Sequence, residues 1–294
     1  MGGDGDRLRI SVVIATLRRP EPLRRTLESI AACEPLPEEV IVVDGDADAA
    51  PLAPLEGGPE LRHVRAEARL TRQRNIGIEQ ARGDVVVFLD DDVKLPRDLF
   101  ARLADPYREA AVVGVTGRVQ EPETTRRGGP ASPARRLLLG SADSGRFTRY
   151  GYPRYVVDAE EPRDVEFMPG CFMSARRDAA AEVGFDEQLG AYALAEDEDF
   201  SYRLSRLGRI VYLPDVVVVH EKLGFRSLDS REFGRLVVRN RAYLFRKNFR
   251  QTPLARAQFG LLLALLVGHR VVNREWRGAL GLLEGAAQLV RGRP

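Results

Sequence analysis

The sequence contains only two cysteines, Cys33 and Cys171, among its 294 residues. Two cysteines cannot build a disulfide framework, and no C-x-x-C pair is present, so we expect a reducing compartment. The first ten residues, MGGDGDRLRI, lack the apolar core of a signal peptide. Together these absences predict a cytoplasmic protein.

The sequence also lacks the motifs of several common ligand-binding classes. No G-x-x-x-x-G-K-[ST] occurs, which excludes a P-loop protein, and no G-x-G-x-x-G follows the first predicted strand, which argues against a dinucleotide fold. The segment DGDAD (44–48) begins like a calcium loop. However, Ala49 stands where that loop needs glycine and Leu55 where it needs glutamate, so a calcium loop is excluded.

Short apolar segments alternate with segments of helical spacing along the first 120 residues. This alternation predicts βαβ units and a mostly parallel sheet, in which ligands bind beyond the carboxyl ends of the strands. Two of the predicted strands end in aspartate, at Asp44 and Asp90. The predicted strands are 9–16, 38–48, 84–92 and 110–119, and the predicted helices are 20–33 and 70–83.

Residues 120–164 break this pattern, because they are rich in proline, glycine, serine and arginine. We expect a long excursion with one short helix near residues 135–139. A loop of this length is either a functional lid or binding loop, or a solvated insertion. After Arg226 the spacing predicts only helices.

Three consecutive aspartates, Asp90 to Asp92, end the third apolar segment. If they continue the strand, Asp90 and Asp92 share one side and Asp91 faces away, because side chains alternate along a strand. Two carboxylates on one side suit Mg²⁺ or Mn²⁺, which also accept phosphate oxygens. The alternative is an acidic turn or a helix N-cap before LPRDLF. The residues alone leave both interpretations open.

A second acidic cluster, AEDEDF (195–200), precedes a segment with helical spacing. The helix dipole favours acids at a helix start, whereas a general base needs a carboxylate close to the reacting centre. His220 ends the apolar segment VVVVH. A single histidine there is either a polar residue at the point where the strand leaves the core, or a metal ligand.

The order of these segments resembles a known family. T-x-x-R-P-x-x-L follows the first strand, VIVVDG forms the second, RQRNIGI precedes the third, and FLDDDV ends it. MPGCFMSARRDAAAEVGFDEQL, EDEDFSYRL, VVVVH and NRAYLFRKN follow in that order. Over about residues 10–249 this order resembles the inverting glycosyltransferases of family 2, near the rhamnosyltransferase-like bacterial members.

The resemblance implies a GT-A fold, an α/β fold with a mostly parallel central sheet flanked by helices. It implies a GT-A domain over residues 1–225, with a nucleotide-binding half at about 1–115 and an acceptor half at about 116–225. Residues 226–294 would form a helical C-terminal extension. The implied partners are a nucleotide-diphospho-sugar donor and a hydroxyl acceptor of unknown type, in glycan, polysaccharide, glycolipid or natural-product biosynthesis, and no nucleic acid.

The resemblance also implies donor-side residues. It places Asp44 against the nucleotide base and Asp90 against the ribose or sugar, with Asp91 as support or a second nucleotide contact. The other residues that it implies for the nucleotide-sugar pocket are Thr16, Arg19, Arg74 and Gly170.

On the reacting side, the resemblance implies that Asp92 holds the divalent metal and that His220 completes the metal site, with Mn²⁺ or Mg²⁺ as cofactor. It implies Asp197 as the catalytic base, with Glu196 beside it on the acceptor side. Asp197 would take the proton of the acceptor hydroxyl during an inverting attack on a hexosyl donor. The metal and a pocket arginine would stabilise the leaving diphosphate.

Two other functions stay open from the residues. A nucleotidyltransferase acting on sugar phosphates also uses paired carboxylates and Mg²⁺, but it needs a glycine-rich basic loop after the first strand, and TLRRPEPL has no glycine. A non-catalytic nucleotide-sugar-binding module would not need the acids and His220 to be intact.

Charge is distributed unevenly along the chain. Residues 231–294 carry 13 Lys/Arg and 3 Asp/Glu, a net charge of +10, so the remainder carries −8. The basic helices could lie on an anionic membrane, at the inner face of the cytoplasmic membrane near a lipid-linked acceptor. Alternatively, FGLLLALLVG (259–268) packs on the catalytic domain or in a homodimer, which we favour because most such stripes are core. The run itself is shorter than the roughly 20 apolar residues of a membrane span.

Overall fold

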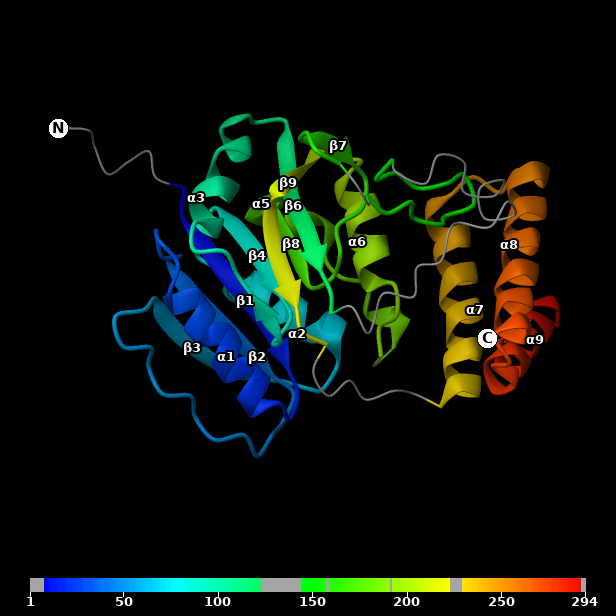
Figure 1. The fold of residues 1–294 in the computed structure, drawn as a ribbon, viewed down its shortest axis with the longest axis horizontal. Coiled ribbons are helices and arrows are strands. Elements are labelled where there is room, and N and C mark those ends of the chain that lie inside the picture. The colour runs from blue at the N-terminus through cyan, green and yellow to red at the C-terminus, as the bar shows by residue number, and fades with distance from the viewer. Residues whose placement is uncertain (1–7, 123–143, 157–158, 191, 223–228, 292–294) are drawn as a thin grey trace. The chain divides into compact units, whose positions relative to one another are not determined.

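The computed structural model describes residues 8–122, 144–156, 159–190, 192–222 and 229–291. The chain divides into two compact units (Figure 1). Unit 1 comprises residues 1–127 and 158–223, and unit 2 comprises residues 128–157 and 224–294. We describe each unit by itself, and the domain boundary expected near residue 225 stays a prediction.

Unit 1 is built on a nine-stranded mixed sheet in the order β3-β2-β1-β4-β8-β6-β9-β5, with β7 paired to β9. Strands β3, β2, β1 and β4 run parallel, as predicted, whereas β8 lies antiparallel between β4 and β6. The strands are β1 (Ile10–Thr16), β2 (Glu39–Asp44), β3 (Glu60–Arg65), β4 (Val85–Leu89), β5 (Val93–Lys94), β6 (Val112–Gln120), β7 (Arg163–Val165), β8 (Phe172–Arg176) and β9 (Arg209–His220).

The main core lies on one face of this sheet. Alternate residues of β1 and β4, such as Val12 and Val87, enter it together with Leu23, Leu27 and Ile30 of α1. Helix α1 starts with a proline at its first turn, where no backbone donor is lost, and its apolar residues recur on one face. The helices of unit 1 are α1 (Pro20–Ala31), α2 (Leu70–Gln80), α3 (Leu99–Ala104), α5 (Arg177–Val183) and α6 (Glu196–Leu204).

The strand ends of β1, β2 and β4 meet at one edge of the sheet. Thr16 is paired with Asp44, and Leu89 is paired with Ile14. The side-chain amide of Gln73 donates hydrogen bonds to the carbonyl oxygens of Thr16 (2.9 Å) and Val43 (2.8 Å). This pair of bonds fixes the start of α2 over the edge where an open α/β sheet binds its ligand.

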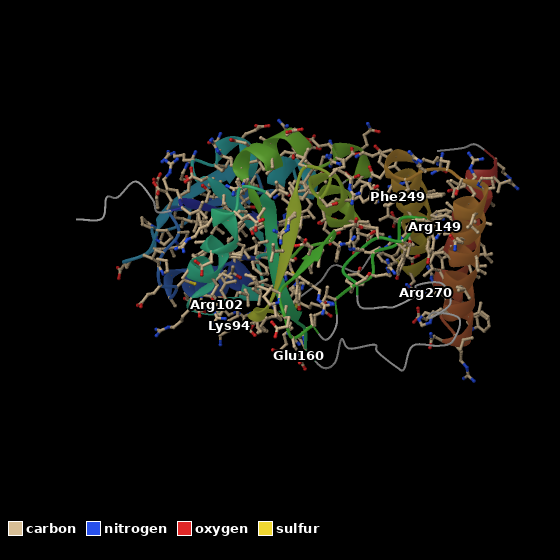
Figure 2. The ribbon with its side chains drawn as sticks, turned by 90° about the horizontal axis from the view of Figure 1, so that it is seen from above. Lys94, Arg102, Arg149, Glu160, Phe249 and Arg270 are labelled. Carbon is tan, nitrogen blue, oxygen red and sulfur yellow. The ribbon has the colours of Figure 1, made fainter. Side chains whose placement is uncertain are left out.

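The described part of unit 2 contains the helices α7 (Ser230–Asn248), α8 (Pro253–Val272) and α9 (Trp276–Val290), as the helical spacing predicted. Phe245 of α7 stacks on Phe259 of α8, with 4.7 Å between ring centroids. Phe249, labelled in Figure 2, packs against Phe147. Helices α7 and α9 approach each other closely, because a Cβ added at Gly281 would lie 2.0 Å from the carbonyl oxygen of Arg231.

The structure changes the expected length of the apolar segment near the C-terminus and agrees with the expected limits of the long excursion. The apolar run 259–268 is half of the 20-residue helix α8, which, within the described residues, is the one helix long and apolar enough to cross a membrane by length and composition. The excursion closes at β7, where Arg163 pairs with Tyr212. The short helix expected near residues 135–139 lies outside the described residues.

Candidate active site

The three aspartates leave the strand. Strand β4 ends at Leu89, and Asp90 to Asp92 form the turn that leads into β5. Of the two interpretations left open by the residues, the structure shows the acidic turn and not a continued strand. The turn nevertheless gives the three carboxylates different partners.

Asp92 and His220, which were predicted to hold the metal, come together, and Asp90, which was expected against the ribose or sugar, joins them. One ligand atom from each residue lies within 4.8 Å of the other two. Strand β9 carries the histidine at its end, and the pairing of His220 with Val93 of β5 places it beside Asp92. His220 Nε2 lies 3.1 Å from Asp92 Oδ1 and 3.7 Å from Asp90 Oδ2. Two carboxylates and one imidazole form a donor set that fits Mn²⁺ and accommodates Mg²⁺.

The charges of this cluster are held in place by their neighbours. Burial by itself would raise the pKa of Asp92, but hydrogen bonds from His220 and Arg19 outweigh it and lower that pKa to about 2. Burial would lower the pKa of His220, but the hydrogen bond to Asp92 and the charges of Asp90 and Asp92 give a net rise. Asp92 is thus ionised throughout the physiological range, as a metal ligand must be.

Asp91 supports the turn from inside the protein. It is buried and accepts a hydrogen bond from the Thr16 hydroxyl at 2.6 Å. Arg19 donates a short hydrogen bond to Asp91 and a second one, of 2.7 Å, to Asp92. Burial raises the pKa of Asp91 to about 6, although Thr16 and Arg19 oppose the rise. Thr16 and Arg19, expected in the nucleotide pocket, therefore have these carboxylates as partners.

Asp44 lies at the end of β2, as expected for a residue that contacts the nucleotide base. Its Oδ1 accepts the backbone N–H of Asp46 at 2.8 Å, and its Oδ2 lies 3.3 Å from His63 Nε2. Sequence reasoning missed His63 together with its strand, β3. The alternating segment ELRHVR, with one of only three histidines, is the signal that could have revealed it.

Arg74 joins the two acidic clusters. Its buried guanidinium donates to Glu196 Oε1 (2.9 Å), to the carbonyl oxygen of Gly170 (2.7 Å) and to Asp90 Oδ1 (3.2 Å). It also lies 5.3 Å from the centroid of the Phe185 ring. The structure places Arg74 between the aspartate turn and the start of α6, and the place in the nucleotide pocket that the resemblance implied stays a prediction.

The start of α6 presents two adjacent acids in different environments. Asp197 Oδ2 accepts the N–H of Gly170 and its Oδ1 accepts the N–H of Glu198, both at 2.9 Å. Glu196 is buried, and burial followed by the charge of Asp197 raises its pKa to about 8 against the opposing charge of Arg74. The neighbouring Asp199 pairs with Arg203 at 2.6 Å and is structural. The different environments of Glu196 and Asp197 favour the protonated form of the first and the charged form of the second.

Gly170 fits this site because it has no side chain. A Cβ added there would lie 3.2 Å from Glu196 Oε1 and 3.3 Å from Asp197 Oδ2. Its N–H and its carbonyl oxygen are both engaged, with Asp197 and Arg74 respectively. The residue therefore links the carboxylate pair to β8, the strand that begins two residues after it.

The fold and this pair of acidic clusters define a glycosyltransferase of the GT-A type. The chain belongs to glycosyl transferase family 2, whose family model matches residues 11–184. The rhamnosyltransferase-like subgroup is not distinguished by this match.

Two curated relatives are similar over most of their length. The succinoglycan biosynthesis protein ExoM of Rhizobium meliloti is 30% identical over 226 residues, which span 73% of this chain and 67% of the relative. The glucosyl-dolichyl phosphate glucuronosyltransferase of Haloferax volcanii is 28% identical over 248 residues, spanning 79% of this chain and 74% of the relative.

Solved structures share the fold. S. aureus TarS 1–349 in complex with UDP aligns with a TM-score of 0.56 at 18% identity, over 90% of this chain and 72% of that one. GalNAc-T7 with UDP, GalNAc and Mn²⁺ aligns with a TM-score of 0.58 at 19% identity, over 80% of this chain and 48% of that one. At these identities the likeness establishes the GT-A α/β fold, which confirms the fold predicted from the sequence.

Proposed function

We propose that the protein transfers a sugar, with inversion, from a nucleotide-diphospho-sugar to an acceptor hydroxyl in a divalent-metal-dependent reaction. The observation that carries this proposal is the bridge made by Arg74, which bonds to Asp90 of the aspartate turn and to Glu196 of the carboxylate pair. One buried side chain thus fixes the distance between a site for the leaving diphosphate and a site for proton removal.

On the donor side, Asp90, Asp92 and His220 are the residues that would hold the metal. A divalent cation bound there supplies positive charge to the diphosphate as it leaves. Asp44, an acceptor-only carboxylate, accepts a hydrogen bond from a base edge that carries an N–H donor, such as uracil, thymine or guanine. UDP in the TarS and GalNAc-T7 structures makes uridine the first base to test.

On the acceptor side, Asp197 takes the proton of the attacking hydroxyl. The hydroxyl oxygen forms a bond to the anomeric carbon while the bond from that carbon to the diphosphate oxygen breaks, and the electron pair leaves with the nucleotide diphosphate. Attack from the face opposite the leaving group inverts the anomeric centre without a covalent enzyme intermediate. Glu196, with its pKa near 8, keeps its proton at neutral pH, so a single negative charge faces the acceptor.

The acceptor class is proposed from the relatives. The names of the two curated relatives refer to succinoglycan biosynthesis and to a glucosyl-dolichyl phosphate. A polysaccharide intermediate or glycolipid is accordingly the acceptor class that we propose for this chain. A hexosyl donor and the rhamnosyltransferase-like subgroup stay predictions.

A thermal-shift screen of UDP-, GDP- and dTDP-sugars, with and without Mn²⁺, tests donor binding, since a ligand of the folded state raises its melting temperature. We expect one nucleotide class to stabilise the protein in a Mn²⁺-dependent way and to release nucleotide diphosphate on incubation. Pyrophosphate release from a nucleoside triphosphate and a sugar phosphate would instead identify a nucleotidyltransferase. Donor binding without any release, over a broad acceptor panel, would favour the non-catalytic module.

A further inference from the structure

Helix α8 is apolar on both its inner and its outer side. Ala255, Phe259 and Leu262 are buried in the core of unit 2, where Phe259 stacks on Phe245 of α7. On the other side, Leu254 is 54% exposed and Leu261 is 45% exposed. Only 17% of the apolar window in this helix is buried. A helix that is apolar all round normally has a second partner beyond its own core.

Helix α9 also has an exposed apolar face in addition to its packed face. Trp276, Leu280 and Leu283, at i, i+4 and i+7, lie on one face and are 63%, 44% and 54% exposed. The opposite face packs on α7 through Gly278, Gly281 and Gly285, which are buried. The close packing of α9 on α7 therefore fixes the orientation of the exposed face of α9. We name the exposed apolar side chains of the two helices the outer surface: Leu254, Leu261, Val271, Val272, Trp276, Leu280, Leu283 and Val290.

The charge next to the outer surface is predominantly positive. From Phe233 to Arg274 the chain has nine Lys/Arg and no Asp or Glu. The two acids that follow, Glu275 and Glu284, pair with arginines. Arg256 of α8 and Arg274 of the turn between α8 and α9 are exposed. Apolar side chains combined with an excess of cations match the interface of an anionic bilayer. A second copy of the chain would bring an identical positive surface against this one, which is electrostatically unfavourable.

We propose that α8 and α9 bind the surface of an anionic lipid bilayer, with the outer surface inserted into the headgroup region. Helix α8 lies along the bilayer, because a spanning α8 would have to give up its stacking on Phe245 and carry Arg256 and Arg270 into the hydrocarbon. Arg270, labelled in Figure 2, is in the last turn of α8 and pairs with Glu275. This proposal is independent of the reaction at Asp197.

The chain contains a built-in probe, because Trp276 is its single tryptophan. With the purified full chain, we expect vesicles of phosphatidylcholine mixed with phosphatidylglycerol to shift the Trp276 emission to the blue, and brominated lipid to quench it. Vesicles of phosphatidylcholine alone should have a much smaller effect, and added salt should weaken the binding. An emission spectrum unchanged by anionic vesicles would overturn the proposal without the need for any variant.

Flotation with the same vesicles adds a test by substitution. Leu280→Ser combined with Leu283→Ser should lower the partition coefficient at least about tenfold, since each removes an apolar side chain from the lipid interface. Arg256→Gln combined with Arg274→Gln should lower it on anionic vesicles. Leu207→Ser is the matched control, because Leu207 is a similarly exposed leucine of unit 1.

Three results would contradict the proposal. The first is a leucine variant that keeps its circular dichroism spectrum and floats like the wild type. The second is vesicle-bound protein that resists extraction at alkaline pH, which would indicate a spanning helix. A dimer in sedimentation equilibrium that the leucine substitutions dissociate, together with no flotation, would show that the outer surface binds a second copy instead.

Discussion

Arg74 donates a hydrogen bond of 2.9 Å to Glu196, a residue 122 positions further along the chain. Both side chains are buried, so the contact is shielded from water. The same guanidinium reaches Asp90 and the carbonyl oxygen of Gly170. Three acceptors from three segments are thus set by one planar donor, and the spacing of the two acidic clusters depends on it.

Substitution of Arg74 by lysine should therefore reduce catalysis severely. Lysine keeps the charge but lacks the planar fork that reaches several acceptors at once. We expect Arg74→Lys to lower kcat/KM by about 100-fold, the cost of a misplacement near 1 Å. The control is Arg72→Lys, because Arg72 is a half-exposed arginine of the same helix that pairs with Glu187. Initial rates near the wild-type value in a folded Arg74→Lys protein would remove Arg74 from this role.

Asp197→Asn tests the assignment of the base. The amide has the size of the carboxylate and its oxygen can still accept the N–H of Gly170, but it cannot take a proton. We expect kcat to fall by about 10²–10⁴-fold, the usual contribution of general base catalysis. The affinity for the donor, measured by calorimetry, should change little. A fall confined to donor affinity, with kcat preserved, would place Asp197 on the donor side.

Glu196 predicts a pH dependence of stability. Its pKa is about 8 in the folded chain and 4.5 in the unfolded reference, so the folded state binds more protons between these values. Stability contributed by this group is therefore present below about pH 4.5 and is lost as the pH rises through about 8. In the presence of a chelator, the melting temperature of Glu196→Gln relative to that of the wild type should increase as the pH rises through this range. For Glu182→Gln, a substitution at an exposed position, the difference in melting temperature from the wild type should not change with pH.

The two neighbouring aspartates should separate metal binding from stability. Asp92→Asn should abolish the Mn²⁺-induced thermal shift, because it removes one ligand of the cluster. Asp91→Asn should retain a Mn²⁺ shift but lose roughly 1–3 kcal/mol of stability, since the buried Thr16 and the partly buried Arg19 lose a charged acceptor. Equal loss of the Mn²⁺ shift in both variants, measured by calorimetric titration, would contradict this division.

The sequence predicted the edge of the sheet well, because the relevant signals are local. Apolar segments that end at Asp44 and Asp90 mark strands whose ends meet, and the pairing of β1 with β2 and β4 follows from the alternation of strands and helices. His220 could be proposed because it ends an apolar segment. The resemblance added roles that spacing alone left open.

The remaining features depend on contacts between distant segments. The place of Arg74 is decided by Gly170 and Glu196, neither of which its own segment reveals. Asp91 was expected as support or as a second nucleotide contact, and only the structure shows that it is buried against Thr16. The length of α8 was underestimated because polar residues such as Gln258 and Arg270 continue the helix beyond the apolar run.

The pairing of Val93 with His220 makes the last strand of the sheet part of the cation cluster. Asp92 and His220 are brought together across most of unit 1, so ligand binding at this point closes a long loop of the chain. Occupancy of the site and attachment of β5 to β9 are then coupled, because ligand binding favours the paired state. The concentrations of donor and cation in the cell would thereby set how often this edge of the sheet opens, and with it how long the enzyme survives proteolysis.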